Sequence, residues 1–171
     1  MPQASPYHQL FVTGLQNAHA VEHQALALID RQLDRYLNYP ELVDRLRRHR
    51  VETERQIARL DEILRGLGEH PSSLKDMTLS MVGNMLALSH APAPDEVLKN
   101  NFVNVAFENF EIASYTSLLT LAEASHHQGA LPLLAQTLEE EQAMAAWVLE
   151  HLPAITLKYA DLRAGGGTAS R

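Results

Sequence analysis

Four long segments of this chain repeat apolar residues at alternating steps of three and four, the spacing that lines one face of an α-helix. In chain order these segments cover residues 12–36, 42–67, 98–122 and 134–152. Each apolar stripe contains or borders a glutamate, and the four glutamates are Glu22, Glu52, Glu108 and Glu141. A carboxylate inside a helical core costs free energy unless it is paired or binds a cation. The pattern therefore predicts an all-α bundle with a carboxylate metal site in its interior.

Histidines accompany two of these glutamates. His19 precedes Glu22 by three residues, and His49 precedes Glu52 by the same step. Residues three apart lie one turn apart on the same helix face, so each imidazole can reach its glutamate. His49 fits either a metal ligand or a hydrogen-bonded core histidine, whereas His19 fits the core role better.

Three more residues fall on the same faces in the second and third segments. Glu111 follows Glu108 by three residues, which suits either a ligand or a hydrogen-bond acceptor beside the site. Gln56 and Tyr115 are neutral, so we expect them to orient carboxylates by hydrogen bonding rather than to bind metal. In the last segment Glu141 lies on the apolar stripe, and its neighbour Glu140 lies one step round the helix.

Composition restricts the class of protein. The chain has 171 residues, a net charge of −7 and no cysteine. Any metal must therefore be held by oxygen and imidazole ligands. No apolar run approaches the roughly 20 residues that cross a bilayer, and the start lacks the regions of a signal peptide, so we expect a cytoplasmic protein. The acidic balance argues against nucleic acid, and the run Arg45, Arg47, Arg48 and Arg50 is expected to form a solvated helix face.

Prolines and glycines separate the predicted helices. Pro40 suits the first turn of the second helix, Gly66 marks its end, Pro132 begins the last long helix, and Pro153 is expected to kink or end that helix. Residues 73–87 are expected to form a short extra helix within a long crossover between two helical hairpins. We expect one helical domain over residues 1–163 and a flexible tail over residues 164–171.

Four motifs, in this order, resemble those of the YciE/YciF-type ferritin-like proteins. They are Glu22-His23-Gln24, His49-x-x-Glu52-Thr53-x-x-Gln56-x-x-Arg59-Leu60, Glu108-Asn109-Phe110-Glu111-Ile112-Ala113-Ser114-Tyr115 and Thr137-Leu138-Glu139-Glu140-Glu141. The resemblance implies a ferritin-like four-helix bundle whose long crossover carries an additional short helix. It also implies a homodimer, a metal-binding carboxylate site and a stress-associated bacterial role. Where the family commonly has tyrosine and an acid before the first glutamate, this chain has His19 and Ala20.

The resemblance further implies two metal ions bridged by Glu52 and Glu141, with Glu22 and Glu108 as terminal ligands. Hard carboxylate oxygens with few imidazoles favour iron, with manganese as the alternative. Ferritin-like chemistry would make the protein an oxidoreductase that uses dioxygen or peroxide. However, the Glu-x-x-His pairs of two-metal bundles are missing, because Arg55 and Met144 occupy the histidine positions.

A second hypothesis remains open from the sequence. The glutamates could be partly exposed acids at the bundle edges, paired with arginine or lysine. The protein would then be a metal-free helical homodimer with a structural or interaction role.

Overall fold

The computed structural model describes residues 5–36, 38–71, 96–167 and 169. Within these ranges the chain forms long α-helices and one short 3-10 helix, without strands. The elements are α1 (Pro6–Leu33), α2 (Pro40–Gly66), α4 (Glu96–Ala124), η1 (Gln128–Ala130) and α5 (Leu131–Ala164). The prediction of an all-α bundle is confirmed. The expected short helix over residues 73–87 lies outside the described residues.

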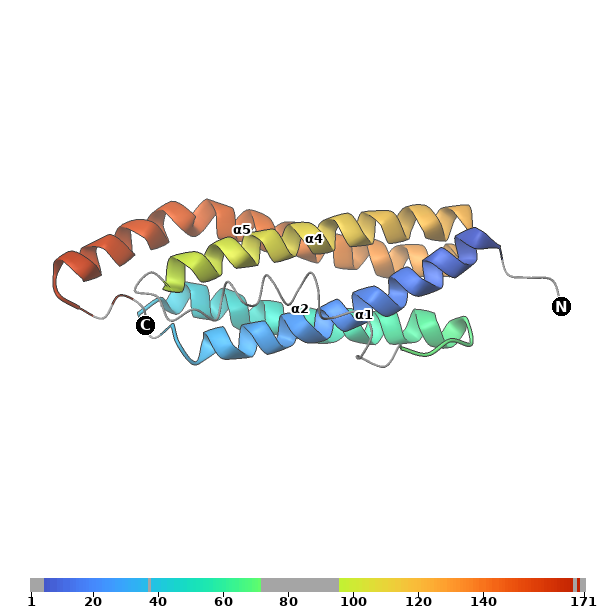
Figure 1. The fold of residues 1–171 in the computed structure, drawn as a ribbon, viewed down its shortest axis with the longest axis horizontal. Helices are drawn as coiled ribbons and strands as arrows, with labels where there is room; N and C mark the ends of the chain where they lie inside the picture. The colour runs from blue at the N-terminus through green and yellow to red at the C-terminus, as the bar shows by residue number, and fades with distance from the viewer. Residues whose placement is uncertain (1–4, 37, 72–95, 168, 170–171) are drawn as a thin grey trace.

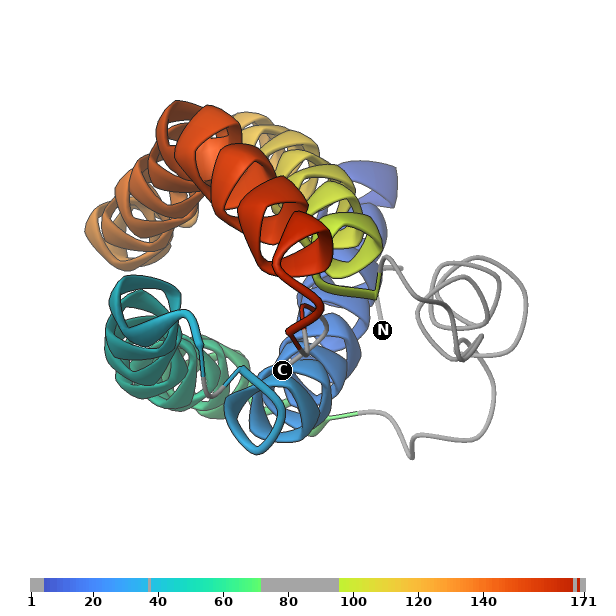
Figure 2. The ribbon, with the colours of Figure 1, turned by 90° about the vertical axis from the view of Figure 1, so that its left-hand side faces the viewer.

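The long helices form two hairpins, α1 with α2 and α4 with α5, which lie along one common axis (Figure 1). Viewed along that axis, the four helices surround a shared interior (Figure 2). Helix α1 packs against both α2 and α4, and α4 packs against α5. Helices α2 and α5 approach each other at fewer positions, and polar side chains span the seam between them. The interior therefore receives side chains from all four helices.

Helix boundaries follow the predicted punctuation in most places. Helix α1 begins after Ser5, whose hydroxyl accepts a hydrogen bond from the backbone N–H of His8 at 3.2 Å. Pro40 is the first residue of α2, and Gly68, just beyond its end, has a φ of 74° that glycine adopts without strain. Pro132 lies in the first turn of α5, as expected.

The expectation that Pro153 could end the last helix is wrong, because α5 continues through this residue to Ala164. Proline removes one backbone hydrogen bond from a helix, but apolar packing can hold the next turns in place. Ile155, Tyr159 and Leu162 supply such packing, since all three belong to or contact the apolar cluster at that end of the bundle.

Part of the predicted tail contacts the bundle. Ala169 is buried, and its carbonyl accepts a hydrogen bond of 2.7 Å from the hydroxyl of Tyr39. The boundary at residue 164 remains a prediction.

The bundle interior has two apolar ends and a polar middle. One apolar cluster centres on Phe11, Leu15, Leu60, Leu64, Leu118 and Leu134. The other centres on Ile29, Tyr36, Leu42, Leu46, Met144 and Val148. Between them, buried polar side chains come from every long helix: Glu22, His49, Thr53, Gln56, Glu108, Glu111, Thr137 and Glu141. Such a layer costs free energy to bury, so its atoms need partners.

Candidate metal centre

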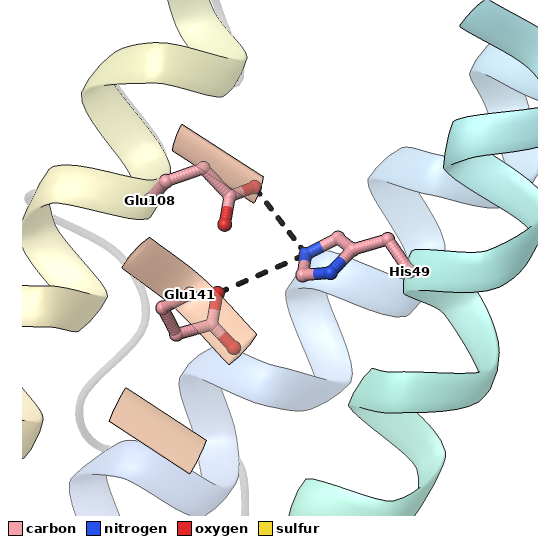
Figure 3. Close-up of side chains that lie close together, drawn as sticks. All are labelled: His49, Glu108 and Glu141. Carbon is pink, nitrogen blue, oxygen red and sulfur yellow. Dashed lines mark ion pairs between the residues drawn. The ribbon is translucent and has the colours of Figure 1, made fainter. Parts of the chain in front are cut away.

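Three side chains from three helices converge in the polar middle. Nε2 of His49 on α2 lies 3.4 Å from Oε1 of Glu108 on α4 and 3.8 Å from Oε2 of Glu141 on α5. Figure 3 shows both carboxylates pointing toward the imidazole. Each residue offers a ligand atom within 4.8 Å of the others, and their exposed fractions are 1%, 5% and 0%. Among the described residues, this is the one group of acidic and histidine side chains whose ligand atoms already lie close enough together to hold a metal ion.

Glu22 and Glu111 lie in the same layer but do not belong to that group of three. Oε1 of Glu22 accepts a hydrogen bond of 2.5 Å from the hydroxyl of Tyr115. Both oxygens of Glu111 are buried without a hydrogen-bond partner among the described residues, and so is Oε2 of Glu22. Oε2 of Glu108 and Oε2 of Glu141 share this condition. Buried acceptors of this kind are rare and call for a proton or a cation.

Glu141 and Glu140 have different surroundings although they are adjacent. Gln56 donates a short hydrogen bond to Glu141 and one of 3.1 Å to Glu140. Arg59 also binds Glu140, through two parallel hydrogen bonds of 2.7 Å. Glu141 therefore faces the interior, while Glu140 ties α5 to α2.

Glu52 lies at the edge of the site. Its side chain is 27% exposed, and its Oε2 accepts hydrogen bonds from Arg45 at 2.9 Å and from Nδ1 of His49 at 3.0 Å. The structure thus places Glu52 behind the imidazole, outside the group formed by His49, Glu108 and Glu141. The structure therefore does not bring Glu52 into the position of a bridging ligand, and that role remains a prediction.

The expectation of a solvated arginine face is wrong for Arg45. This side chain is buried and pairs with Glu52, whereas Arg47 is 67% exposed. Arg45 precedes His49 by four residues, so the helix turn carries it to the same inner face.

His19 takes part in a different contact. Its Nε2 lies 3.1 Å from Oδ1 of Asp61 on α2, and its side chain is 10% exposed. Burial, opposed by the Asp61 carboxylate, lowers the pKa of His19. The structure therefore does not bring His19 into the group around His49.

The carboxyl groups of the layer differ in their affinity for protons. Burial raises the pKa of Glu22 to about 8, although the Tyr115 hydroxyl opposes the shift. Burial and neighbouring carboxylates also raise the pKa of Glu111 and of Glu141 well above the ordinary value. Several acids packed together in a dry space cannot all ionise, so most of them hold protons when no cation is present.

His49 and its two partners, Glu108 and Glu52, favour their charged forms instead. Burial by itself would lower the pKa of His49, but Glu108 and Glu52 raise it to about 9. Burial opposes ionisation of Glu108, yet the charged imidazole lowers the pKa of this carboxyl. Burial likewise opposes ionisation of Glu52, but His49 and Arg45 lower its pKa to about 2. The raised pKa of His49 and the lowered pKa values of Glu108 and Glu52 favour a charged imidazole between two ionised carboxylates.

The donor set fits a hard divalent cation. An ion with octahedral ligands at about 2.1 Å has neighbouring donors about 3 Å apart, so small side-chain movements would close the group of three on an ion. The unpartnered oxygens of Glu108 and Glu141 would then gain a partner. Carboxylates with one imidazole suit iron or manganese better than copper. The structure brings together three residues that could hold one ion, and both predicted ions remain predictions.

Sequence reasoning named some of the residues that position the site but did not predict their contacts. Arg45, Arg59 and Glu140 hold Glu52 and Gln56 in place, and the reciprocal amide pair of Gln32 with Asn104 links α1 to α4. Polar residues on an inner helix face were the available signal.

The fold and the buried carboxylates together define a ferritin-like bundle. Residues 7–161 match the family described as Domain of unknown function (DUF892). Protein YciF of Escherichia coli (strain K12) is 31% identical over 142 residues, which cover 78% of this chain and 82% of that protein. The chain belongs to the DUF892 family, and the predicted resemblance to YciF-type proteins is confirmed.

Solved structures agree with this assignment. A crystal structure of a protein from Xanthomonas campestris pv. campestris matches with a TM-score of 0.80 and 29% identity, covering 94% of this chain and 99% of the other. The structure of the E. coli stress protein YciF matches with a TM-score of 0.71 and 23% identity, covering 89% and 96%, and supports the fold. No helix in the described ranges is long and apolar enough to span a membrane.

Proposed function

We propose that this protein binds iron, or alternatively manganese, in the polar middle of the bundle through His49, Glu108 and Glu141. The observation that carries the proposal is the convergence of these three buried side chains from three helices. A divalent cation would offset the repulsion among the neighbouring carboxyls and would satisfy oxygens that have no hydrogen-bond donor.

Glu111 and Glu22 extend the proposed site toward a second ion. Both oxygens of Glu111 and one oxygen of Glu22 are unpartnered within the described structure, so these carboxyls are the candidates for its ligands. Bound iron would supply electron-transfer and Lewis-acid chemistry toward dioxygen or peroxide. The residues of this chain would hold the ion away from bulk water. The description of E. coli YciF as a stress protein supports a role under stress.

A different observation favours a second function, that of a homodimer acting through its surface. Three large apolar side chains are mostly exposed on α4 and α5, namely Phe102 at 54%, Leu149 at 52% and Leu157 at 66%. A second copy of the chain would remove such side chains from water. Sedimentation of the chelator-treated protein tests this function independently of metal.

The metal proposal is tested by titrating iron(II), without oxygen, or manganese(II) into chelator-treated protein. Thermal unfolding and elemental analysis after desalting are the two readouts. A cation that binds only the folded state stabilises it by about 2.7 kcal/mol at about a hundred times its Kd. We expect a rise in Tm and retention of at least one ion per chain.

Glu141→Gln is the decisive variant, because the amide keeps the size of the side chain but cannot ionise to become an anionic metal ligand. We expect it to fold and to lose most of the metal-dependent rise in Tm. Glu139→Gln is the matched control, since this exposed acid lies two residues earlier on the same helix. Equal metal retention by Glu141→Gln and wild type would overturn the proposed site.

A further inference from the structure

A second cluster of metal-binding residue types lies on the outer side of the α1–α2 hairpin. His19 and His23 are four residues apart on α1, so they project from the same face of that helix. Asp61 on α2 lies opposite, with its Oδ1 at 3.1 Å from Nε2 of His19. Glu22, between the two histidines in sequence, projects inward to Tyr115. One turn of α1 thus presents a carboxylate to the core and His19 to Asp61 on α2, with the exposed His23 beside His19.

The positions of these side chains suit a tetrahedral cation. Zinc binds imidazole nitrogen and carboxylate oxygen at about 2.0–2.2 Å, which places neighbouring donors about 3.3 Å apart. The 3.1 Å between His19 and Asp61 is close to this spacing. We propose that His19, His23 and Asp61 bind a zinc ion on the surface of the α1–α2 hairpin.

In the proposed site, His23 completes the three ligands by a change of side-chain rotamer. Its ring meets the ring of His19 edge-on, with centroids 4.7 Å apart, and the residue is exposed. Among the described residues only the group around His49 already has all its ligand atoms within 4.8 Å, so His23 must turn toward Asp61. Exposed side chains change rotamer within nanoseconds.

The ligand set separates this site from the one in the core. Two imidazoles and one carboxylate favour zinc and related borderline ions, whereas the core offers mainly carboxylates. The Asp61 side chain is 38% exposed, so water can reach this ligand. The surface site shares no ligand with the core group, and it can bind zinc whether or not the core holds iron or manganese.

Zinc chloride alone, in the absence of iron and manganese, is the probe. Calorimetry and competition with a colorimetric zinc chelator give stoichiometry and Kd for the full-length protein. We expect His23→Asn and Asp61→Asn each to raise the Kd for one zinc ion per chain by at least about tenfold. We expect Glu141→Gln to bind this zinc ion with wild-type affinity, which distinguishes the surface site from the core site.

Two matched controls exclude a general effect of removing a histidine or an acid. His126 is an exposed histidine at the α4 end with a φ of 62°, a conformation that asparagine tolerates, so His126→Asn should bind zinc as wild type does. Glu62→Gln removes the exposed acid next to Asp61 and should also have no effect. Circular dichroism and Tm verify that each variant is folded.

Anomalous diffraction at the zinc edge supplies a readout that does not depend on variants. Crystals grown with zinc should show a peak between α1 and α2, bonded to Nε2 of His19 and a carboxylate oxygen of Asp61. The proposal is overturned if this position lacks a peak, or if His23→Asn and Asp61→Asn bind zinc with wild-type stoichiometry and affinity.

Discussion

The hydroxyl of Tyr115 on α4 donates a hydrogen bond of 2.5 Å to Oε1 of Glu22 on α1. Both side chains are buried, with exposed fractions of 1% each. Burial raises the pKa of Tyr115 well above its ordinary value, so the hydroxyl keeps its proton and remains a donor at neutral pH. This contact joins the two hairpins beside the group of His49, Glu108 and Glu141.

Replacing Tyr115 by phenylalanine tests this contact. The variant leaves one more oxygen of Glu22 without a donor, so we expect a loss of about 1–3 kcal/mol in the free energy of unfolding. The pKa of Glu22, about 8 in the wild type, should rise further because the hydrogen bond lowers it. Urea unfolding and NMR titration of the carboxyl carbon measure the two effects. Tyr7→Phe, at an exposed tyrosine, should change neither.

The stability of the metal-free protein should fall as the pH rises from about 5 to 9. A carboxyl whose pKa is raised in the folded state, such as Glu22, contributes stability below its unfolded pKa of about 4.5 and loses it through about 8. Glu111 and Glu141 act in the same direction. His49 also contributes below its unfolded value near 6.5 and loses that contribution through about 9. Glu52, with a pKa of about 2, changes protonation only at acidic pH and so does not contribute to the change in stability between pH 5 and 9.

Urea unfolding of chelator-treated protein at several pH values measures this dependence. Each group that changes protonation can contribute a slope of up to about 1.4 kcal/mol per pH unit. Glu22→Gln removes one such group, so its slope should be shallower than that of the wild type. A wild-type stability that stays level or increases between pH 5 and 9 would contradict the protonated state of the buried carboxyls.

Replacing the titratable carboxyl of Glu111 by an amide should stabilise the metal-free protein, because at neutral pH this carboxyl must take up a proton when the chain folds. Both oxygens of this carboxyl lack a hydrogen-bond partner among the described residues, and its ionisation is opposed first by burial and then by Glu22 and Glu108. We expect Glu111→Gln to raise the free energy of unfolding by about 1–3 kcal/mol at pH 8. Chemical denaturation measures the change, with Glu123→Gln, an exposed acid on the same helix, as the control. A destabilised Glu111→Gln would indicate that this carboxyl has a partner in solution.

Arg59 should hold α2 to α5 through Glu140. The two side chains are 10% and 18% exposed and form two hydrogen bonds of 2.7 Å. Arg59→Met keeps the apolar stem but leaves the carboxylate with less compensation, so we expect a loss of about 2 kcal/mol. Urea unfolding is the suitable measurement because urea does not screen charges. Arg65→Met, at an exposed position near the end of α2, should leave stability unchanged, and a similar result for Arg59→Met would show that the pair is dispensable.

Much of the fold could be predicted from the chain because helical periodicity is a local property. Apolar residues at steps of three and four identify the long helices, and Pro40, Gly66 and Pro132 mark where they begin or end. The inward position of Glu22, Glu108 and Glu141 follows from the same period, since each shares a face with neighbouring apolar residues. The helical period also places Glu111, Gln56 and Tyr115 in the interior.

The sequence alone determined which residues lie on the inner face of each helix, because 3.6 residues per turn set that direction within one segment. The tertiary structure decided which partner each of them meets. His19 contacts Asp61 and not the group of His49, Glu108 and Glu141. Glu52 accepts hydrogen bonds from Arg45 and His49 and lies at the edge of that group. Helix packing and side-chain rotamers set these distances, and both depend on residues far apart in the chain.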